Sequence, residues 1–156
     1  MKSFVANYLI SESGTFLKNG IIVAEDHGTA LQYIDTTNDL EERAQLSFHN
    51  GILIAGCSFL KTNEPESKSA HPIKALVAKA VEGQSTFSLP DLIELSKQVQ
   101  VEFPEMKIPE ILNDSIDLLQ SNAGFIKIIV PGIFLLTGVD LPRLRFKPKT
   151  KLKRIL

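Results

Sequence analysis

The spacing of hydrophobic residues changes twice along this 156-residue chain, and this change limits what the chain can fold into. Residues 4–10, 21–24 and 29–34 are rich in β-branched and aromatic side chains, which indicates strands. After the polar stretch 64–69 the hydrophobic residues recur with a helical period of about 3.6. The strand pattern returns at residue 125. We therefore expect strands from both ends of the chain to pair, because each β portion is too small to form a stable sheet alone.

Turn-forming residue pairs divide the two β portions into short strands. Asn19–Gly20 predicts a tight turn, and Asn50–Gly51 predicts another after the strand 45–49. Pro131–Gly132 predicts a third turn, before the buried strand 133–137.

Three helices are predicted between the two β portions. Gly83 is a plausible end for the first. Ser88 is a suitable N-cap for the second, with Asp91 placed to favour the positive end of the helix dipole, and Pro104 stops it. Pro109 opens the third. The apolar stripes of these helices are interpreted as core faces.

The predicted fold class is α+β. We expect a β-sandwich built from both chain ends, with a helical insertion of about three helices. A single composite domain would cover residues 1–156, with an N-terminal β part (1–64), a helical segment (65–124) and a C-terminal β part (125–156).

Composition excludes several classes of protein. A net charge of −1 gives no overall field that would attract nucleic acid or an anionic membrane. No run of about 18 apolar residues is present, so neither a membrane span nor a membrane partner is expected. The single cysteine leaves no intrachain disulfide, and the N-terminus lacks the pattern of a signal peptide. The expected compartment is the cytoplasm.

Both ends of the chain carry a recognisable order of strands and turns. The strand 17–23 is followed by the turn Asp26–Gly28 and by the apolar strand 50–56, which ends in glycine. Near the other end, the strand 131–136 begins with Pro-Gly and leads into the loop 138–141. In this order the two ends resemble the β-sandwich of the metal-dependent amidohydrolase superfamily, in its cytosine deaminase-like and chlorohydrolase-like branch. In that family the sandwich lies beside a metal-bearing (β/α)8 barrel, whose last helices residues 88–124 resemble.

The chain departs from this family at the metal site. The family places two metal-binding histidines just after the strand that ends at Gly56, and Lys61 and Asn63 occupy these positions. A protonated lysine has no lone pair for a metal, and asparagine is a poor transition-metal ligand. The stretch between residues 60 and 125 is too short for a barrel, which needs about 200 residues or more. The resemblance therefore implies a truncated composite domain with no metal site, no cofactor and no catalytic residue of the family.

Other candidate residues carry weak signals. His27, His49 and His71 share no metal-ligand spacing. Cys57 follows a strand-ending glycine and could expose a thiol, but a buried and inert cysteine is favoured.

The C-terminal stretch is strongly basic, with positive residues near every second position. These residues are Arg143, Arg145, Lys147, Lys149, Lys151, Lys153 and Arg154. One interpretation is an anion-binding or nucleic-acid-binding strip. The favoured interpretation is a final edge strand whose lysines prevent unwanted strand pairing, because no aromatic side chain is placed to stack bases.

The leading hypothesis is a non-catalytic, amidohydrolase-like remnant with a binding or assembly role. Loss of the barrel would leave apolar helix faces uncovered, so a homodimer is expected, and a different protein partner stays open. The predicted interface residues are Leu76, Leu95, Val99 and Leu118. One alternative is a small hydrolase-like enzyme with an unrecognised site. A second is an anion or nucleic-acid binder through the basic C-terminal strand, with nucleic acid disfavoured.

Overall fold

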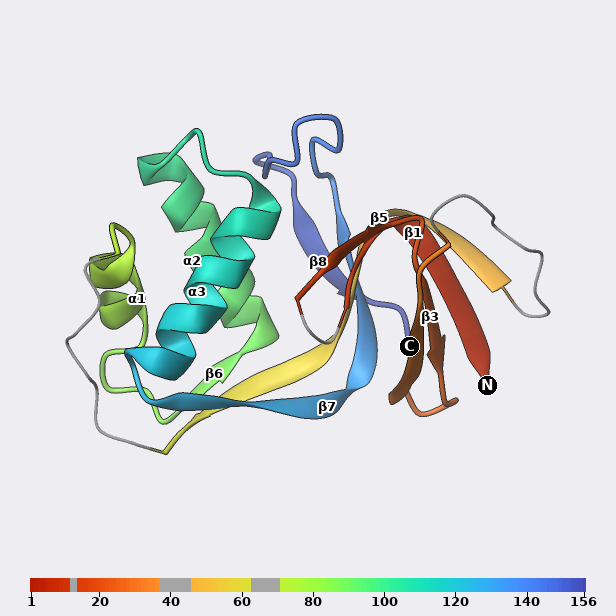
Figure 1. Cartoon of the computed structure of the whole chain (residues 1–156), viewed down its shortest axis with the longest axis horizontal. Coiled ribbons are helices and arrows are strands. Elements are labelled where there is room, and N and C mark those ends of the chain that lie inside the picture. Colours follow the sequence, from red (N-terminus) through yellow and green to blue (C-terminus); the bar gives the residue numbers. More distant parts are fainter. Residues whose placement is uncertain (12–13, 37–45, 63–70) are drawn as a thin grey trace. The chain divides into compact units, whose positions relative to one another are not determined.

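The computed structural model describes residues 1–11, 14–36, 46–62 and 71–156, so the predicted breaker 64–69 and Asn63 lie outside it. Within these residues it contains eight strands and three helices, shown in Figure 1, which confirms the α+β class. The strands are β1 (Lys2–Ile10), β2 (Phe16–Lys18), β3 (Ile21–Ala24), β4 (Ala30–Ile34), β5 (Leu46–Lys61), β6 (Thr86–Ser88), β7 (Phe125–Thr137) and β8 (Lys151–Arg154). The helices are α1 (Lys74–Ala80), α2 (Leu89–Glu102) and α3 (Ile108–Ser121).

The described strands form one open sheet with the order β4-β3-β1-β5-β7-β8. In addition, β2 pairs with β1 and β6 pairs with β5. Most of the registered pairs are antiparallel, whereas β1 and β5 are parallel. Because β5 neighbours β7, strands from the two chain ends are joined by hydrogen bonds. This pairing confirms the expectation that the two β portions combine.

The chain divides into two compact units. The β unit comprises Met1–Gly56, Val130–Pro142 and Lys147–Leu156, and the helical unit comprises Cys57–Ile129 and Arg143–Phe146. These boundaries lie inside β5 and β7, whereas the sequence suggested divisions at 64/65 and 124/125. Each of these two long strands therefore contributes residues to both units.

The β unit is built around one apolar cluster. Its buried members come from β1, β3, β5 and β7 and are Phe4, Ala6, Leu9, Ile22, Ala24, Leu53, Ile133 and Leu135. Ile155 and Leu156, which follow the edge strand β8, pack against the same cluster as Ala30 of β4 at the opposite end of the strand order. The sheet of this unit therefore curls around its core.

The predicted turns at Asn50–Gly51 and Pro131–Gly132 are wrong, because β5 and β7 run through these positions without reversing. Gly51 has a φ of 143°, and a Cβ atom added there would lie 2.3 Å from the carbonyl oxygen of Leu136. A Cβ added at Gly56 would similarly lie 2.6 Å from the carbonyl oxygen of Val130. These glycines in β5 allow another backbone segment to approach closely. Glycine inside a strand often marks such a close approach rather than a turn.

The helical unit confirms the predicted start of its second helix. The Ser88 hydroxyl accepts a hydrogen bond from the Asp91 backbone N–H (3.2 Å), and the Asp91 carboxylate accepts one from the Ser88 backbone N–H (2.9 Å). This capping box satisfies backbone donors that a helix end otherwise leaves unpaired. The predicted stripe of α2 is buried, including Leu92, Leu95 and Val99. The three helices lie on one side of the part of the sheet that belongs to this unit (Figure 1).

The predicted basic strand is mostly wrong, because only Lys151–Arg154 is extended and paired. Leu144 has a φ of 52°, which interrupts any extended conformation. The segment 143–146 instead docks on the helical unit, where the Ile108 N–H donates to the Leu144 carbonyl (2.8 Å) and the Arg145 guanidinium donates to the Pro104 carbonyl. The alternation of basic and apolar residues therefore does not reflect a strand over most of this stretch.

The side chain of Gln100 holds the same segment by two hydrogen bonds. Its Nε2 donates to the carbonyl oxygen of Phe146 (2.9 Å), and its Oε1 accepts from the N–H of Phe146 (2.8 Å). The amide of Gln100 thus pairs with both backbone polar groups of one residue, as a neighbouring strand would. Phe146 itself is buried.

Candidate functional site

The stretch where the resemblance places metal ligands is a paired strand. After Gly56, β5 continues to Lys61, and Ser58, Phe59 and Leu60 pair with residues 86–88 of β6. The Lys61 N–H donates to the Ser85 carbonyl (2.9 Å), and the Thr62 N–H donates to the Gly124 carbonyl (2.9 Å). Lys61 is exposed. The backbone of this stretch therefore lies in a hydrogen-bonded ladder rather than in a ligand-bearing loop.

His27 lies in an exposed turn between β3 and β4. Its Nε2 is 2.9 Å from the Glu25 carboxylate and 2.8 Å from the Thr29 hydroxyl. In a catalytic triad the imidazole contacts the nucleophile with one nitrogen and the orienting carboxylate with the other. Here both partners share one nitrogen, so this group is not arranged for nucleophilic catalysis.

His71 is held at the start of α1 by both of its ring nitrogens. Its Nδ1 accepts a hydrogen bond from the backbone N–H of Ile73 (3.2 Å), and its Nε2 lies 3.1 Å from the Asp114 carboxylate. The accepting Nδ1 is unprotonated, so in the neutral ring Nε2 carries the proton and donates it to Asp114. Neither nitrogen is free to accept a proton from a substrate, and the contact ties α1 to α3.

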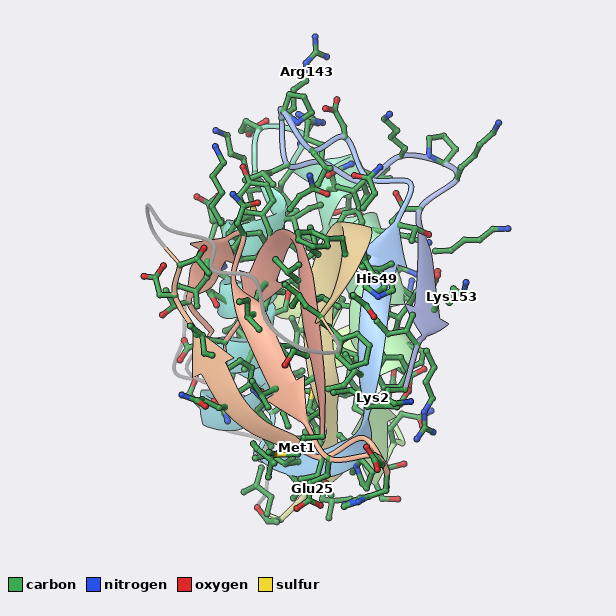
Figure 2. All side chains as sticks on the ribbon, turned by 90° about the vertical axis from the view of Figure 1, so that its right-hand side faces the viewer. Met1, Lys2, Glu25, His49, Arg143 and Lys153 are labelled. Atoms are coloured by element: carbon green, nitrogen blue, oxygen red, sulfur yellow. The ribbon has the colours of Figure 1, made fainter. Side chains whose placement is uncertain are left out.

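The imidazole of His49, in the β unit, has a buried ring nitrogen and a lowered pKa. Its Nε2 is inaccessible to solvent and has no hydrogen-bond partner among the described residues, and its ring lies 5.8 Å from that of Phe4. Burial lowers the pKa of His49, and the positive charge of Lys153 on β8 lowers it further (Figure 2). The imidazole is therefore neutral at neutral pH. Because the unfolded chain binds the proton more readily, this histidine makes the protein less stable as the pH falls below its ordinary pKa of about 6.5.

Cys57 is buried in the helical unit, as the favoured interpretation expected. Burial raises the pKa of its thiol, and the nearby Lys127 opposes this shift to a smaller extent. A reactive cysteine needs a lowered pKa and access to solvent. Cys57 has neither, so it packs as a small apolar side chain.

The structure divides the basic C-terminal residues between the two units. Arg143 and Arg145 belong to the helical unit, and Arg143 is exposed (Figure 2). The other five lie in the β unit, on or before the edge strand β8, and are exposed: Lys147, Lys149, Lys151, Lys153 and Arg154. None of these four lysines forms an ion pair with a carboxylate in the described ranges. Only Lys151, Lys153 and Arg154 lie on β8, the last strand of the sheet, where basic side chains can protect an edge.

Three of the four predicted interface side chains are already covered within one chain. Leu95, Val99 and Leu118 are 2%, 0% and 1% exposed. They pack inside the helical unit, so they are not accessible to a second chain. Leu76 is half-buried and reaches the surface.

Leu76 lines a groove on the surface of the helical unit. The groove is a hollow of about 500 Å³ between α1 and α2, lined by Leu76, Lys79, Ala80, Gln98, Val101 and Glu102. Of these, the sequence interpretation singled out only Leu76 as a surface residue. In the sequence, Val101 could have indicated this groove, because it is an apolar residue of α2 that lies outside the buried stripe of that helix.

Over residues 1–11, 14–36, 46–62 and 71–156, no three His, Cys, Asp or Glu side chains come together in a way that could hold a metal ion. Over the same residues no helix is both long and apolar enough to cross a membrane. Comparison of the chain with protein-family models, with curated proteins and with solved structures finds no match. These comparisons therefore do not link the chain to the amidohydrolase superfamily.

Proposed function

We propose that this chain is a non-catalytic, amidohydrolase-like composite domain whose role is binding or assembly. The observation that carries the proposal is the course of β5, which continues past Gly56 to Lys61 as a strand paired with β6. In the family, this is the point where the chain leaves the strand and presents its metal ligands. Here the strand continues beyond this point, and its residues from Cys57 onward belong to the helical unit.

The side chains of this stretch support a structural role. Phe59 and Phe87 face each other across the β5–β6 ladder, and both are buried. Cys57, two residues before Phe59 and therefore on the same face of the strand, is also buried. The stretch thus presents apolar side chains to the core. A metal site there would instead require several polar ligands that converge on one point.

The finer fold assignment belongs to the same proposal. The curled sheet of the β unit, built from β1, β3, β5, β7 and β8 around one core, supports a β-sandwich of the amidohydrolase type. We assign the domain to the cytoplasm, because Cys57 is a buried, free thiol and the sequence provides no second cysteine for a disulfide.

Metal content tests the non-catalytic assignment. We expect protein that has been incubated with Zn²⁺, Mn²⁺ or Fe²⁺ and then desalted to retain far less than one metal ion per chain by elemental analysis. Variants His71→Ala and His49→Ala should not change this value, and His27→Ala serves as the exposed control. One equivalent of metal that is lost in His71→Ala or His49→Ala, but kept in His27→Ala, would show a metal centre and overturn the proposal.

A further inference from the structure

The first half of β7 is an open edge of the sheet. In the strand order β5 lies on one side of β7, and β8 lies on the other side but pairs only with residues 134–137. Within the part of the chain that the structure describes, no second backbone segment bonds to residues 125–131. Residues 126–129, which belong to the helical unit, therefore have a hydrogen-bonded neighbour on one side only.

The main-chain groups that face this open edge belong to Lys127 and Ile129. The Thr62 N–H, at the end of β5, donates to the carbonyl of Gly124 (2.9 Å), so that carbonyl points toward β5. Trans peptide groups alternate in direction along a strand, so the polar groups of every second residue after Gly124 point away from β5. A Cβ atom added in β5 would lie 2.6 Å from the carbonyl oxygen of Val130, which fits this alternation. Lys127 and Ile129 thus each present one N–H donor and one C=O acceptor to the open edge.

This edge has little of the protection that edge strands normally carry. Natural sheets guard their edges with lysines, prolines, bulges or very short strands. β8 follows that rule, because it has four residues and three of them are basic. Between residues 126 and 129, β7 instead has three isoleucines and a single charge, Lys127. Ile126 and Ile129 are 46% and 57% exposed. An apolar edge of this kind indicates that another strand covers it.

The side chains of this edge indicate which strand that is. Alternation places Ile126 and Ile128 on one face of β7, and Lys127 and Ile129 on the other. A covering strand must bring apolar contacts to both faces and must keep its own positive charge away from Lys127. β7 of a second chain meets both requirements when it runs antiparallel to the first around a two-fold axis at Ile128.

We propose that a second copy of the chain pairs with this edge, β7 against β7, around a two-fold axis at Ile128. The inference rests on the proposed binding or assembly role and gives that role a partner and a location. The N–H and C=O groups of Lys127 bond to those of Ile129 of the partner subunit, and symmetry repeats the pair. Ile128 faces Ile128 of the partner subunit as a non-hydrogen-bonded pair. The same edge serves both chains, as a two-fold interface requires.

The register follows from the residues on either side of Ile128. An axis at Lys127 would place two lysines directly opposite one another, which is unfavourable. An axis at Ile129 would place Pro131, which has no N–H, opposite Lys127. An axis at Ile126 would leave Ile129 without a strand residue opposite it. Only the axis at Ile128 satisfies all four outward-facing main-chain groups and separates the lysines.

Amide hydrogen exchange over a protein concentration series tests the pairing itself. The N–H groups of Ile126 and Ile128 point toward β5, so they should be protected at every concentration and serve as the internal control. The N–H groups of Lys127 and Ile129 should exchange quickly in dilute protein. Because a short ladder gives a weak dimer, their exchange should slow on the order of tenfold as the concentration rises to about 1 mM.

Cysteine substitution tests the position of the axis. In the proposed register the Cα of residue 128 lies about 4.5 Å from its copy, which is within the range of a disulfide. Ile128→Cys should therefore give a cross-linked dimer under mild oxidation, seen on a non-reducing gel. Ile126→Cys is the matched control, because it lies on the same face of the same edge but about 14 Å from its own copy. It should remain monomeric, and the buried Cys57 is present in both variants.

Two substitutions at Ile129 test the cross-strand pair with Lys127. Ile129→Glu places opposite charges beside one another twice in the dimer, and Ile129→Lys places like charges there twice. Both variants lose the same isoleucine, so light scattering at low salt should show that the first associates on the order of tenfold more tightly than the second. Far-UV circular dichroism establishes that each variant is folded.

Three results would overturn the inference. They are exchange at Lys127 and Ile129 that does not change with concentration, equal cross-linking of Ile128→Cys and Ile126→Cys, and equal association of the two Ile129 variants. A monomer that instead binds an extended segment of another protein at this edge belongs to the first result. None of these outcomes bears on metal content, so the failure of the dimer and the failure of the non-catalytic assignment are distinguishable.

Discussion

Replacing Gly51 with alanine is expected to lower the free energy of unfolding by about 3–5 kcal/mol, from backbone strain together with overpacking. Gly51 has a φ of 143°, which residues with a side chain rarely adopt, and the new Cβ would meet the Leu136 carbonyl oxygen at 2.3 Å. That oxygen belongs to the backbone of β7 and cannot rotate away as the tip of a side chain can. Urea denaturation measures the change.

Gly83→Ala is the matched control for this prediction. Gly83 also has a positive φ, of 71°, but a Cβ there would meet nothing within 4 Å. The substitution should therefore cost only the backbone term of about 1–2 kcal/mol. The difference between the two variants isolates the close approach of the two backbones. Equal losses of stability at Gly51 and Gly83 would contradict the path of β5 beside β7.

Replacing Gln100 with leucine is expected to lower the free energy of unfolding by about 2–3 kcal/mol. Leucine keeps much of the side-chain volume but removes both hydrogen bonds to Phe146. The N–H and carbonyl of this residue then lose their partners in a partly buried position, which costs more than the bonds themselves contribute. Urea denaturation again provides the value.

Gln120→Leu is the control for the loss of a helical glutamine, because Gln120 is exposed on α3. Its effect should stay within about 0.5 kcal/mol, as for most surface substitutions. If Gln100→Leu were as mild as Gln120→Leu, the segment 143–146 would not be held by Gln100.

The sequence predicted those features of the fold that depend on neighbouring residues. The capping box of α2 needs only Ser88 and Asp91, three residues apart, and its position was correct. The role of Gly51 depends instead on the backbone of Leu136, which lies far away in the sequence. Glycine tolerates positive φ both in turns and in strands, so the local sequence did not distinguish a reversal from a close approach.

The C-terminal stretch also shows that the local sequence does not reveal contacts with residues far away in the chain. Its alternating pattern predicted one long strand, but residues 143–146 are held by hydrogen bonds to Gln100, Pro104 and Ile108, which lie far earlier in the chain. The single φ of 52° at Leu144 is enough to end the strand pattern, and leucine gives no local sign of such a conformation.

The candidate site was predictable in part. Leu76 was predicted as an interface residue and does reach the surface, whereas the strand predicted to end at Gly56 continues to Lys61. The predicted interface at Leu95 and Val99 followed from counting apolar stripes, yet those stripes are covered by packing within the helical unit. Only the packing of α1 against α2 brings Val101 and Leu76 into one groove, and no pattern within either helix encodes that contact.

The central claim is that the chain after Gly56 is a paired strand and not a ligand-bearing loop. Amide hydrogen exchange resolved by NMR tests it most directly, at the N–H groups of Lys61 and Thr62. Both donate to backbone carbonyls, of Ser85 and Gly124. The account predicts that they exchange at least on the order of a hundredfold more slowly than unstructured amides, as expected for N–H groups inside a stable element. Exchange of both groups at the rate of an open loop would contradict it.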